Sequence, residues 1–122
     1  MPRILVIDDH EDICSFMKEA LQMSGYAVDV ACDGNSGLAS QRRQPADVVI
    51  TDIFMPDADG METIQRLKKE FPKVKIIAMS GGGMITKNVD YLSMAREFGA
   101  DRVLPKPFDH NALLGAISSV LG

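Results

Sequence analysis

Residues 4–9 read ILVIDD, four branched aliphatic residues followed directly by two aspartates. A continuous apolar run of this kind is typical of a parallel strand covered on both faces, so we predict a buried strand that ends at Asp8. The same pattern recurs along the chain, and segments of helical period separate the runs. The strands are expected at residues 4–7, 27–31, 48–51, 74–79 and 102–104, and the helices at 12–24, 33–41, 59–70, 89–98 and 109–121.

Five β/α units in 122 residues predict an α/β fold built on an open, doubly wound parallel sheet, (βα)5 in a single domain over residues 1–122. A closed eight-unit barrel is excluded because it needs about 250 residues. Gly25 is expected to end the first helix, while Gly34 and Gly37 weaken the prediction of the second. Ligands of open sheets bind beyond the carboxyl ends of the strands, which directs attention to the residues there.

Composition excludes several classes of function. With 13 basic and 17 acidic side chains the net charge is −4, which argues against direct binding of nucleic acid. The longest apolar runs, Ile4–Ile7 and Ile76–Met79, are too short to span a membrane, and a cytoplasmic protein is expected. Cys14 and Cys32 form no metal-binding spacing and are expected to be small buried thiols in a reducing compartment.

Polar side chains follow four of the predicted strands and should converge on one edge of the sheet. Three carboxylates there would repel one another, because a like-charge pair at about 4 Å costs on the order of 4 kcal/mol at an effective dielectric near 20. They therefore call for a cation, and oxygen ligands without Cys or His favour Mg²⁺, which completes its octahedron with a substrate phosphate. The residues are Asp8, Asp9, Asp52, Ser80 and Lys106.

This set suits phosphoryl transfer. Asp52, at the end of the central strand, can attack as a carboxylate to form an acyl phosphate. Lys106 supplies a positive charge and Ser80 a hydroxyl donor for phosphoryl oxygens. Gly81 and Gly82 leave room and backbone N–H groups nearby.

The chain resembles the receiver domains of bacterial two-component response regulators, including chemotaxis regulators, over essentially its whole length. The matching motifs are residues 4–9, 51–56 with 59–60, 79–80, 99–101 and 106–108. The resemblance implies a flavodoxin-like sheet with strand order 2-1-3-4-5 and a phosphoacceptor at Asp52. It also implies a Mg²⁺ ion bound by Asp9 directly, by Asp8 largely through water, by Asp52 and by the backbone carbonyl of Phe54.

The resemblance further implies that Ser80 and Lys106 bind the phosphoryl oxygens and that the Lys106–Pro107 peptide is cis, which aims the lysine at the site. Pro105 suits an edge strand, where the missing N–H is tolerated. A histidine kinase or phosphotransfer protein would supply the phosphoryl group. A downstream protein or fused output domain would read the fourth helix, fifth strand and fifth helix. Such a domain is a phosphoacceptor in a phosphorelay rather than an enzyme, with at most self-phosphorylation from small donors and self-dephosphorylation.

Two features depart from the family pattern. Val103 stands where the family usually has an aromatic residue, so the usual switch, in which Ser80 and that ring move together, cannot operate unchanged. The segment Gly81–Asn88 is longer than is common and is a candidate mobile loop. His10, beside the acidic pair, and His110 are expected to face solvent.

Two other functions fit the fold. A Mg²⁺-dependent aspartyl phosphatase would need a second acid two residues after the nucleophile, where this chain has Phe54. An FMN-binding flavodoxin relative would need a hydroxyl-rich loop at residues 8–12, where the carboxylates would instead repel the phosphate. The start at Met1 slightly favours a stand-alone regulator over a receiver taken from a longer chain.

Overall fold

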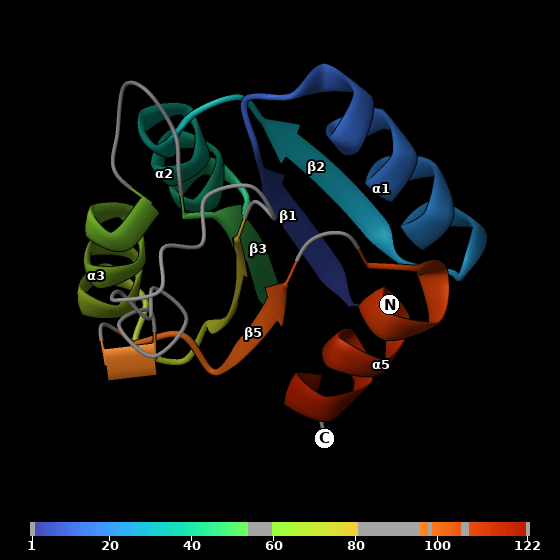
Figure 1. Ribbon diagram of the computed structural model, residues 1–122. Coiled ribbons are helices and arrows are strands. Elements are labelled where there is room, and N and C mark those ends of the chain that lie inside the picture. The colour runs from blue at the N-terminus through green and yellow to red at the C-terminus, as the bar shows by residue number, and fades with distance from the viewer. Residues whose placement is uncertain (1, 54–59, 81–95, 98, 106–107, 122) are drawn as a thin grey trace.

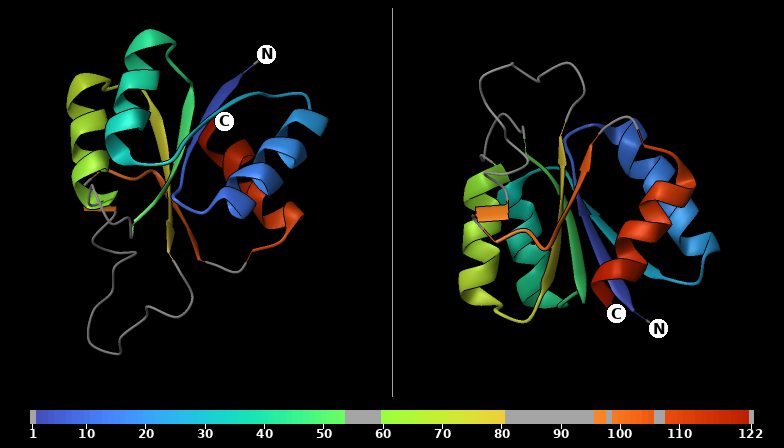
Figure 2. Two further views of the ribbon diagram at one scale, coloured as in Figure 1. Left: turned by 90° about the horizontal axis from the view of Figure 1, so that it is seen from above. Right: turned by 60° about the horizontal axis from the view of Figure 1, so that its bottom comes forward.

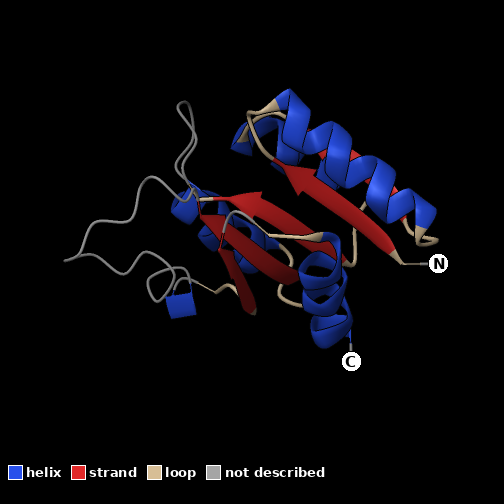
Figure 3. Cartoon of the chain, turned by 45° about the vertical axis from the view of Figure 1, so that its right-hand side comes forward, coloured by secondary structure: helices blue, strands red, loops and turns tan. Residues whose placement is uncertain are grey.

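The computed structural model describes residues 2–53, 60–80, 96–97, 99–105 and 108–121 (Figure 1). Its strands form one five-stranded sheet in the order β2-β1-β3-β4-β5, and every neighbouring pair is parallel, so the predicted fold class and strand order are confirmed. Figure 3 shows the strands running in the same direction. The elements are β1 (Arg3–Ile7), α1 (Glu11–Met23), β2 (Ala27–Ala31), α2 (Gly34–Arg43), β3 (Val48–Asp52), α3 (Gly60–Glu70), β4 (Lys75–Ser80), β5 (Arg102–Pro105) and α5 (His110–Leu121).

Helices cover both faces of the sheet (Figure 2), with α1 and α5 on one face and α2 and α3 on the other. Alternate residues of β1 serve the two layers: Ile4 and Val6 pack with α1 and α5, while Leu5 and Ile7 pack with α2 and α3. All four are almost completely buried. This explains why the strand reads as a continuous apolar run rather than an alternating one.

Helix α2 forms despite its glycines. Asp33 caps it, since a side-chain oxygen accepts a 2.7 Å hydrogen bond from the Ser36 backbone N–H. This hydrogen bond lowers the pKa of Asp33 below its usual value. A Cβ on Gly37 would overlap the side chain of Ile7, with Cγ1 only 2.8 Å away, so the glycine lets α2 lie close against β1.

The first helix ends where the sequence predicts. Gly25 has φ of +95°, a left-handed conformation that glycine adopts without strain. Its N–H donates to the carbonyl of Gln22, and the N–H of Tyr26 donates to that of Leu21, so these two carbonyls in the last turn of α1 are satisfied.

The edge strand β5 carries Pro105, opposite Ser80 of β4, in agreement with the prediction that proline marks an edge. Of the helix expected at 89–98, only residues 96–97 are described as helical, and the rest lies outside the described residues, as does the segment 81–88. Among the described helices, none is both long and apolar enough to cross a membrane.

The prediction of two buried thiols is wrong for Cys32. Cys14 on α1 is half-buried, but Cys32 is exposed. Cys32 directly follows the end of β2, which is an edge strand of the sheet that the described residues form.

Candidate functional site

The sheet brings two of the predicted site carboxylates to neighbouring strand ends. Ile7, the last residue of β1, pairs with Thr51 of β3, so Asp8 follows β1 beside the point where Asp52 ends β3. The Asp8 N–H donates to the carbonyl of Ala31, which anchors this corner to β2 as well. Both aspartates therefore lie at the carboxyl edge of the two central strands, where ligands of such sheets bind.

Asp8, Asp9, His10 and Asp52 form a cluster at this edge. One carboxylate oxygen from each aspartate and one imidazole nitrogen all lie within 4.8 Å of one another. Asp8 is only 1% exposed and Asp52 only 3% exposed, whereas Asp9 reaches solvent. Two buried carboxylates this close repel strongly unless positive charge or hydrogen-bond donors compensate them.

His10 takes part in this cluster, which the sequence did not lead us to expect. Its side chain is 61% exposed, as predicted, but Nδ1 lies 2.9 Å from Oδ1 of Asp8 and 3.2 Å from Oδ1 of Asp9. Its backbone N–H also donates to Oδ1 of Asp8. An aspartate that accepts a hydrogen bond from the backbone two residues later forms an Asx turn, and this turn folds the histidine back over the acidic pair.

The donor set fits Mg²⁺. Two ligands on opposite sides of an ion that binds oxygen at 2.0–2.1 Å are about 4.2 Å apart, so the cluster could enclose one ion after small adjustments. Asp8, Asp9 and Asp52 supply hard carboxylate oxygens, the type of ligand that Mg²⁺ prefers. A bound cation would also offset the repulsion between Asp8 and Asp52.

Other predicted site residues are placed only in part. The backbone of Ser80 ends β4 beside Pro105, on the same sheet edge as Asp52. Phe54, Lys106 and Pro107 lie outside the described residues, and so do Gly81 and Gly82. The roles predicted for these residues and the cis peptide at Pro107 stay predictions.

Val103 lies on β5 opposite Ala78 of β4 and is partly buried. It packs against the core layer that α2 and α3 cover. The position thus holds a short aliphatic side chain already in contact with the core, with no ring to move between buried and exposed positions.

The motif at residues 99–101 has a structural role near this strand. One carboxylate oxygen of Asp101 accepts a hydrogen bond from the Ile76 N–H at 2.8 Å and lies 3.0 Å from Nζ of Lys68. Gly99 has φ of +124° and leaves space for the Lys68 side chain. These contacts tie α3 and the approach to β5 onto β4, away from the acidic cluster.

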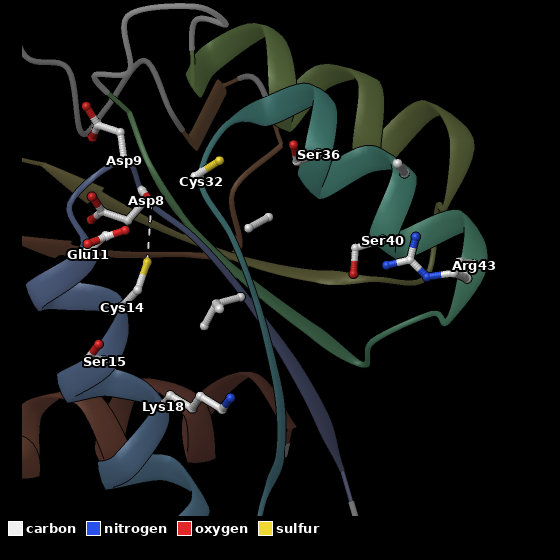
Figure 4. A pocket seen from close by; sticks show the side chains of 13 residues that line it. Asp8, Asp9, Glu11, Cys14, Ser15, Lys18, Cys32, Ser36, Ser40 and Arg43 are labelled. Carbon is white, nitrogen blue, oxygen red and sulfur yellow. Dashed lines mark hydrogen bonds between the residues drawn. The ribbon is translucent and has the colours of Figure 1, made fainter.

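An open cleft of about 860 Å³ adjoins the acidic cluster between α1 and α2, across the outer edge of β2 (Figure 4). Asp8 and Asp9 line one end of it, and Lys18 and Arg43 lie farther along. Cys14 points toward the cleft while its thiol donates to the backbone carbonyl of Asp8 at 3.3 Å. The site edge is thus accessible from the side of the molecule on which β2 lies.

Comparison with known proteins identifies the family. Residues 4–118 match the response regulator receiver domain. The transcriptional regulatory protein CpxR of Klebsiella pneumoniae subsp. pneumoniae (strain HS11286) is 32% identical over 121 residues, which cover 99% of this chain and 50% of CpxR. The chain therefore spans about half the length of the curated relatives it matches.

Solved structures agree with the sequence match. The Vibrio cholerae chemotaxis protein CheY4 superposes with a TM-score of 0.89 at 27% identity, covering 98% of both chains. A CheY-like receiver domain protein from Methanospirillum hungatei JF-1 gives a TM-score of 0.90 at 29% identity, covering 99% of this chain and 94% of that one. On the family match, the relatives and the shared fold, the chain belongs to the response regulator receiver domains, the phosphoacceptor modules of two-component signalling.

Proposed function

We propose that Asp52 is the phosphoacceptor of this receiver and that phosphorylation there is Mg²⁺-dependent. The observation that carries the proposal is the cluster itself: Asp52 ends the central strand with its side chain almost completely buried, and an oxygen of it lies within 4.8 Å of ligand atoms of Asp8, Asp9 and His10. A carboxylate held at a strand end, beside a site that can bind a divalent cation, is suited to attack on phosphorus.

In the proposed reaction a carboxylate oxygen of Asp52 forms a bond to the phosphorus of the donor. The bond from phosphorus to the donor's leaving group breaks, and the leaving group keeps the electron pair and takes up a proton. Mg²⁺ would be held by Asp8, Asp9, Asp52 and the Phe54 carbonyl, and when bound it supplies positive charge that offsets the charge of the phosphoryl oxygens.

The remaining site residues bind the transferred group in this proposal. The hydroxyl of Ser80 donates a hydrogen bond to one phosphoryl oxygen, and the ammonium group of Lys106 pairs with another. Pro107 aims Lys106 at the site, and movement of Ser80 on phosphorylation would alter β5, where Val103 replaces the usual aromatic residue. The change passed to a partner would then depend on strand and helix displacement rather than on the burial of a ring.

The donor is proposed to be a sensor histidine kinase or phosphotransfer protein. The response is passed to a downstream protein or an attached output domain through the fourth helix, β5 and α5. As a receiver the chain acts in the cytoplasm and as a single unit over residues 1–122, with no turnover beyond self-phosphorylation from small donors and self-dephosphorylation. CpxR, which is about twice as long as the matched region, is named as a transcriptional regulator, which supports an output domain in that relative.

The phosphoacceptor is tested by intact mass spectrometry after incubation with a small phosphodonor. The chain is expected to gain one phosphoryl group with Mg²⁺ and none with excess chelator, and Asp52→Ala should gain none. Asp12→Ala is the matched control, because Asp12 is an exposed aspartate in the first turn of α1, and it should be labelled like the unaltered chain. Undiminished labelling of Asp52→Ala would contradict the assignment.

No observation favours the phosphatase alternative. The position two residues after Asp52 is Phe54, which has no acidic group to protonate a leaving alcohol. Hydrolysis of phosphomonoesters by the purified chain, with many turnovers and dependent on Asp52, would reverse that assignment.

A further inference from the structure

His10 is a residue of the acidic cluster to which the proposed phosphotransfer assigns no role. It is also the one residue of the cluster whose ligand atom is a nitrogen rather than an oxygen. Its Nδ1 lies 2.9 Å from Oδ1 of Asp8 and 3.2 Å from Oδ1 of Asp9, so the ring faces both carboxylates rather than extending away from them.

The local backbone holds the ring in this place. His10 is the residue that precedes α1, with an extended conformation of φ −94° and ψ 110°, and its N–H donates to Oδ1 of Asp8. Its side chain makes no hydrogen bond to the first turn of the helix. The imidazole therefore makes no capping hydrogen bond, and the turn places it over the carboxylates.

We propose that His10 is a metal ligand, and that it widens the cation preference of the site from Mg²⁺ toward divalent transition metals such as Ni²⁺. This inference rests on the proposed function, because it concerns the same cation site. An imidazole nitrogen of His10 lies within 4.8 Å of an oxygen from each of Asp8, Asp9 and Asp52. Two opposite ligands of one such ion lie about 4.2 Å apart. A movement of less than about 1 Å would let all four bind one ion.

The chemistry of the donors sets the direction of the preference. Mg²⁺ is a hard cation that binds carboxylate oxygen and water, and it gains little from an imidazole. Divalent first-row transition metals bind imidazole well, and their affinities rise along the series toward Ni²⁺ and Cu²⁺. Ni²⁺ is the better probe here, because imidazole suits it while it accepts oxygen ligands as well. His10 should therefore stabilise bound Ni²⁺ strongly and bound Mg²⁺ weakly.

An alternative role would be that of a counter-ion. A protonated His10 would offset the charge of Asp8 and Asp9 and would compete with any cation for them. The two roles give opposite results when the ring is removed: loss of a ligand weakens cation binding, and loss of a competing positive charge strengthens it.

The experiment measures Mg²⁺ and Ni²⁺ affinities by titration calorimetry on the untagged chain and on His10→Ala. All variants carry Cys14→Ser and Cys32→Ser, so that no thiolate binds Ni²⁺. We expect His10→Ala to weaken Ni²⁺ binding about tenfold or more while Mg²⁺ binding changes less than about threefold. Pulsed EPR with Mn²⁺ in place of Mg²⁺ should show a nearby nitrogen in the parent chain and none in His10→Ala.

His110→Ala is the matched control. It removes the chain's other histidine, which is exposed at the first residue of α5, and it should leave both affinities unchanged. Asp52→Ala should weaken the binding of both cations, since Asp52 belongs to the same cluster. Far-UV circular dichroism of each variant checks that the fold is retained.

The outcomes separate this inference from the proposed function. Equal Ni²⁺ affinity in the parent chain and His10→Ala, or tighter binding of both cations by His10→Ala, overturns the role of His10 and leaves the Mg²⁺ site in place. Unchanged affinities in Asp52→Ala would overturn both, because the cations would then bind elsewhere. The inference is supported if His10→Ala binds Ni²⁺ more weakly, binds Mg²⁺ almost unchanged, and loses the nitrogen signal in the EPR spectrum.

Discussion

Asp8 is a buried charged residue whose surroundings should reduce the stability of the metal-free fold. Its side chain is almost completely buried, yet it lies beside the carboxylates of Asp9 and Asp52. Repulsion within this group raises the free energy of the metal-free fold. A strand end shaped only for stability would carry fewer negative charges, and the cluster is compatible with a bound cation.

We therefore expect Asp8→Asn to be more stable than the parent chain in chelator, by roughly 1–3 kcal/mol, because it removes one of the mutually repelling charges while keeping the shape of the side chain. Added Mg²⁺ should stabilise the parent chain by mass action and should have much less effect on the variant. Urea unfolding with chelator and with Mg²⁺ measures both effects. A variant less stable than the parent in chelator would contradict the repulsion argument.

At the scale of elements, two glycines in helices should respond to the same substitution in opposite directions. Gly37→Ala should destabilise the chain by about 1–3 kcal/mol, because the new methyl group collides with Ile7 of β1 and overpacks the core. Gly115 of α5 is exposed, and no described atom lies within 4 Å of a Cβ built there. Gly115→Ala should stabilise by up to about 1 kcal/mol through helix propensity.

Thermal or urea unfolding of both variants checks this pair. Equal effects of the two substitutions would show that propensity alone governs them, and the close contact of α2 with β1 would lose its support.

Asp101 joins three elements, and its removal should be costly. Asp101→Ala leaves the N–H of Ile76 without its side-chain acceptor and Lys68 without its ion pair, so we expect a loss of about 1–3 kcal/mol. Asp101→Asn is the matched control: it keeps an acceptor oxygen and should lose less. Equal losses in the two variants, measured by urea unfolding, would assign the effect to charge alone.

Asp33 gives α2 a contribution to stability that depends on pH. Its pKa is lowered in the folded chain, chiefly by the hydrogen bond from the Ser36 backbone N–H, from an ordinary value of 3.8. A group with a lowered folded pKa stabilises the fold above its unfolded pKa and loses that contribution as the pH falls through the folded pKa. Its effect should therefore be complete at about pH 5 and shrink below about pH 4.

Asp33→Asn isolates this effect, because asparagine caps a helix but does not titrate. As the pH falls from about 5 to about 3, the parent chain should lose more unfolding free energy than Asp33→Asn does. The other acidic groups titrate alike in both chains, so their contributions to the unfolding free energy cancel in this difference. A difference that stays constant across this range would rule out the ionised cap.

For the whole molecule, local pattern was sufficient to predict the strands and the fold class. The apolar runs correspond to β1 through β5, and Gly25 ends α1 as the pattern indicated. The order of the strands could not be derived from these local signals and came from the family resemblance. The local sequence also could not predict the packing that favours glycine at position 37 of α2, because this packing depends on Ile7, thirty residues earlier in the chain.

The site was predicted where it depends on strand ends and missed where it depends on a turn. Asp8 and Asp52 meet because β1 and β3 are neighbours, which follows from the strand order. His10 contacts Asp8 because of an Asx turn, and a single exposed histidine gives no periodic signal of such a turn. Its place directly between an acidic pair and the first residue of a helix was the available clue. Cys32 was misjudged because edge strands expose residues that central strands bury.

The central claim is that the phosphoryl group resides on Asp52, and locating it directly is the most decisive measurement. The chain is phosphorylated with a small donor and Mg²⁺, then reduced with borohydride, which converts an aspartyl phosphate to homoserine. Trypsin should release residues 44–66, and this peptide also contains Asp47, Asp57 and Asp59, so fragment ions on both sides of Asp52 are required. We predict homoserine at residue 52 and aspartate at the other three positions; homoserine at another aspartate, with residue 52 unchanged, would contradict the account.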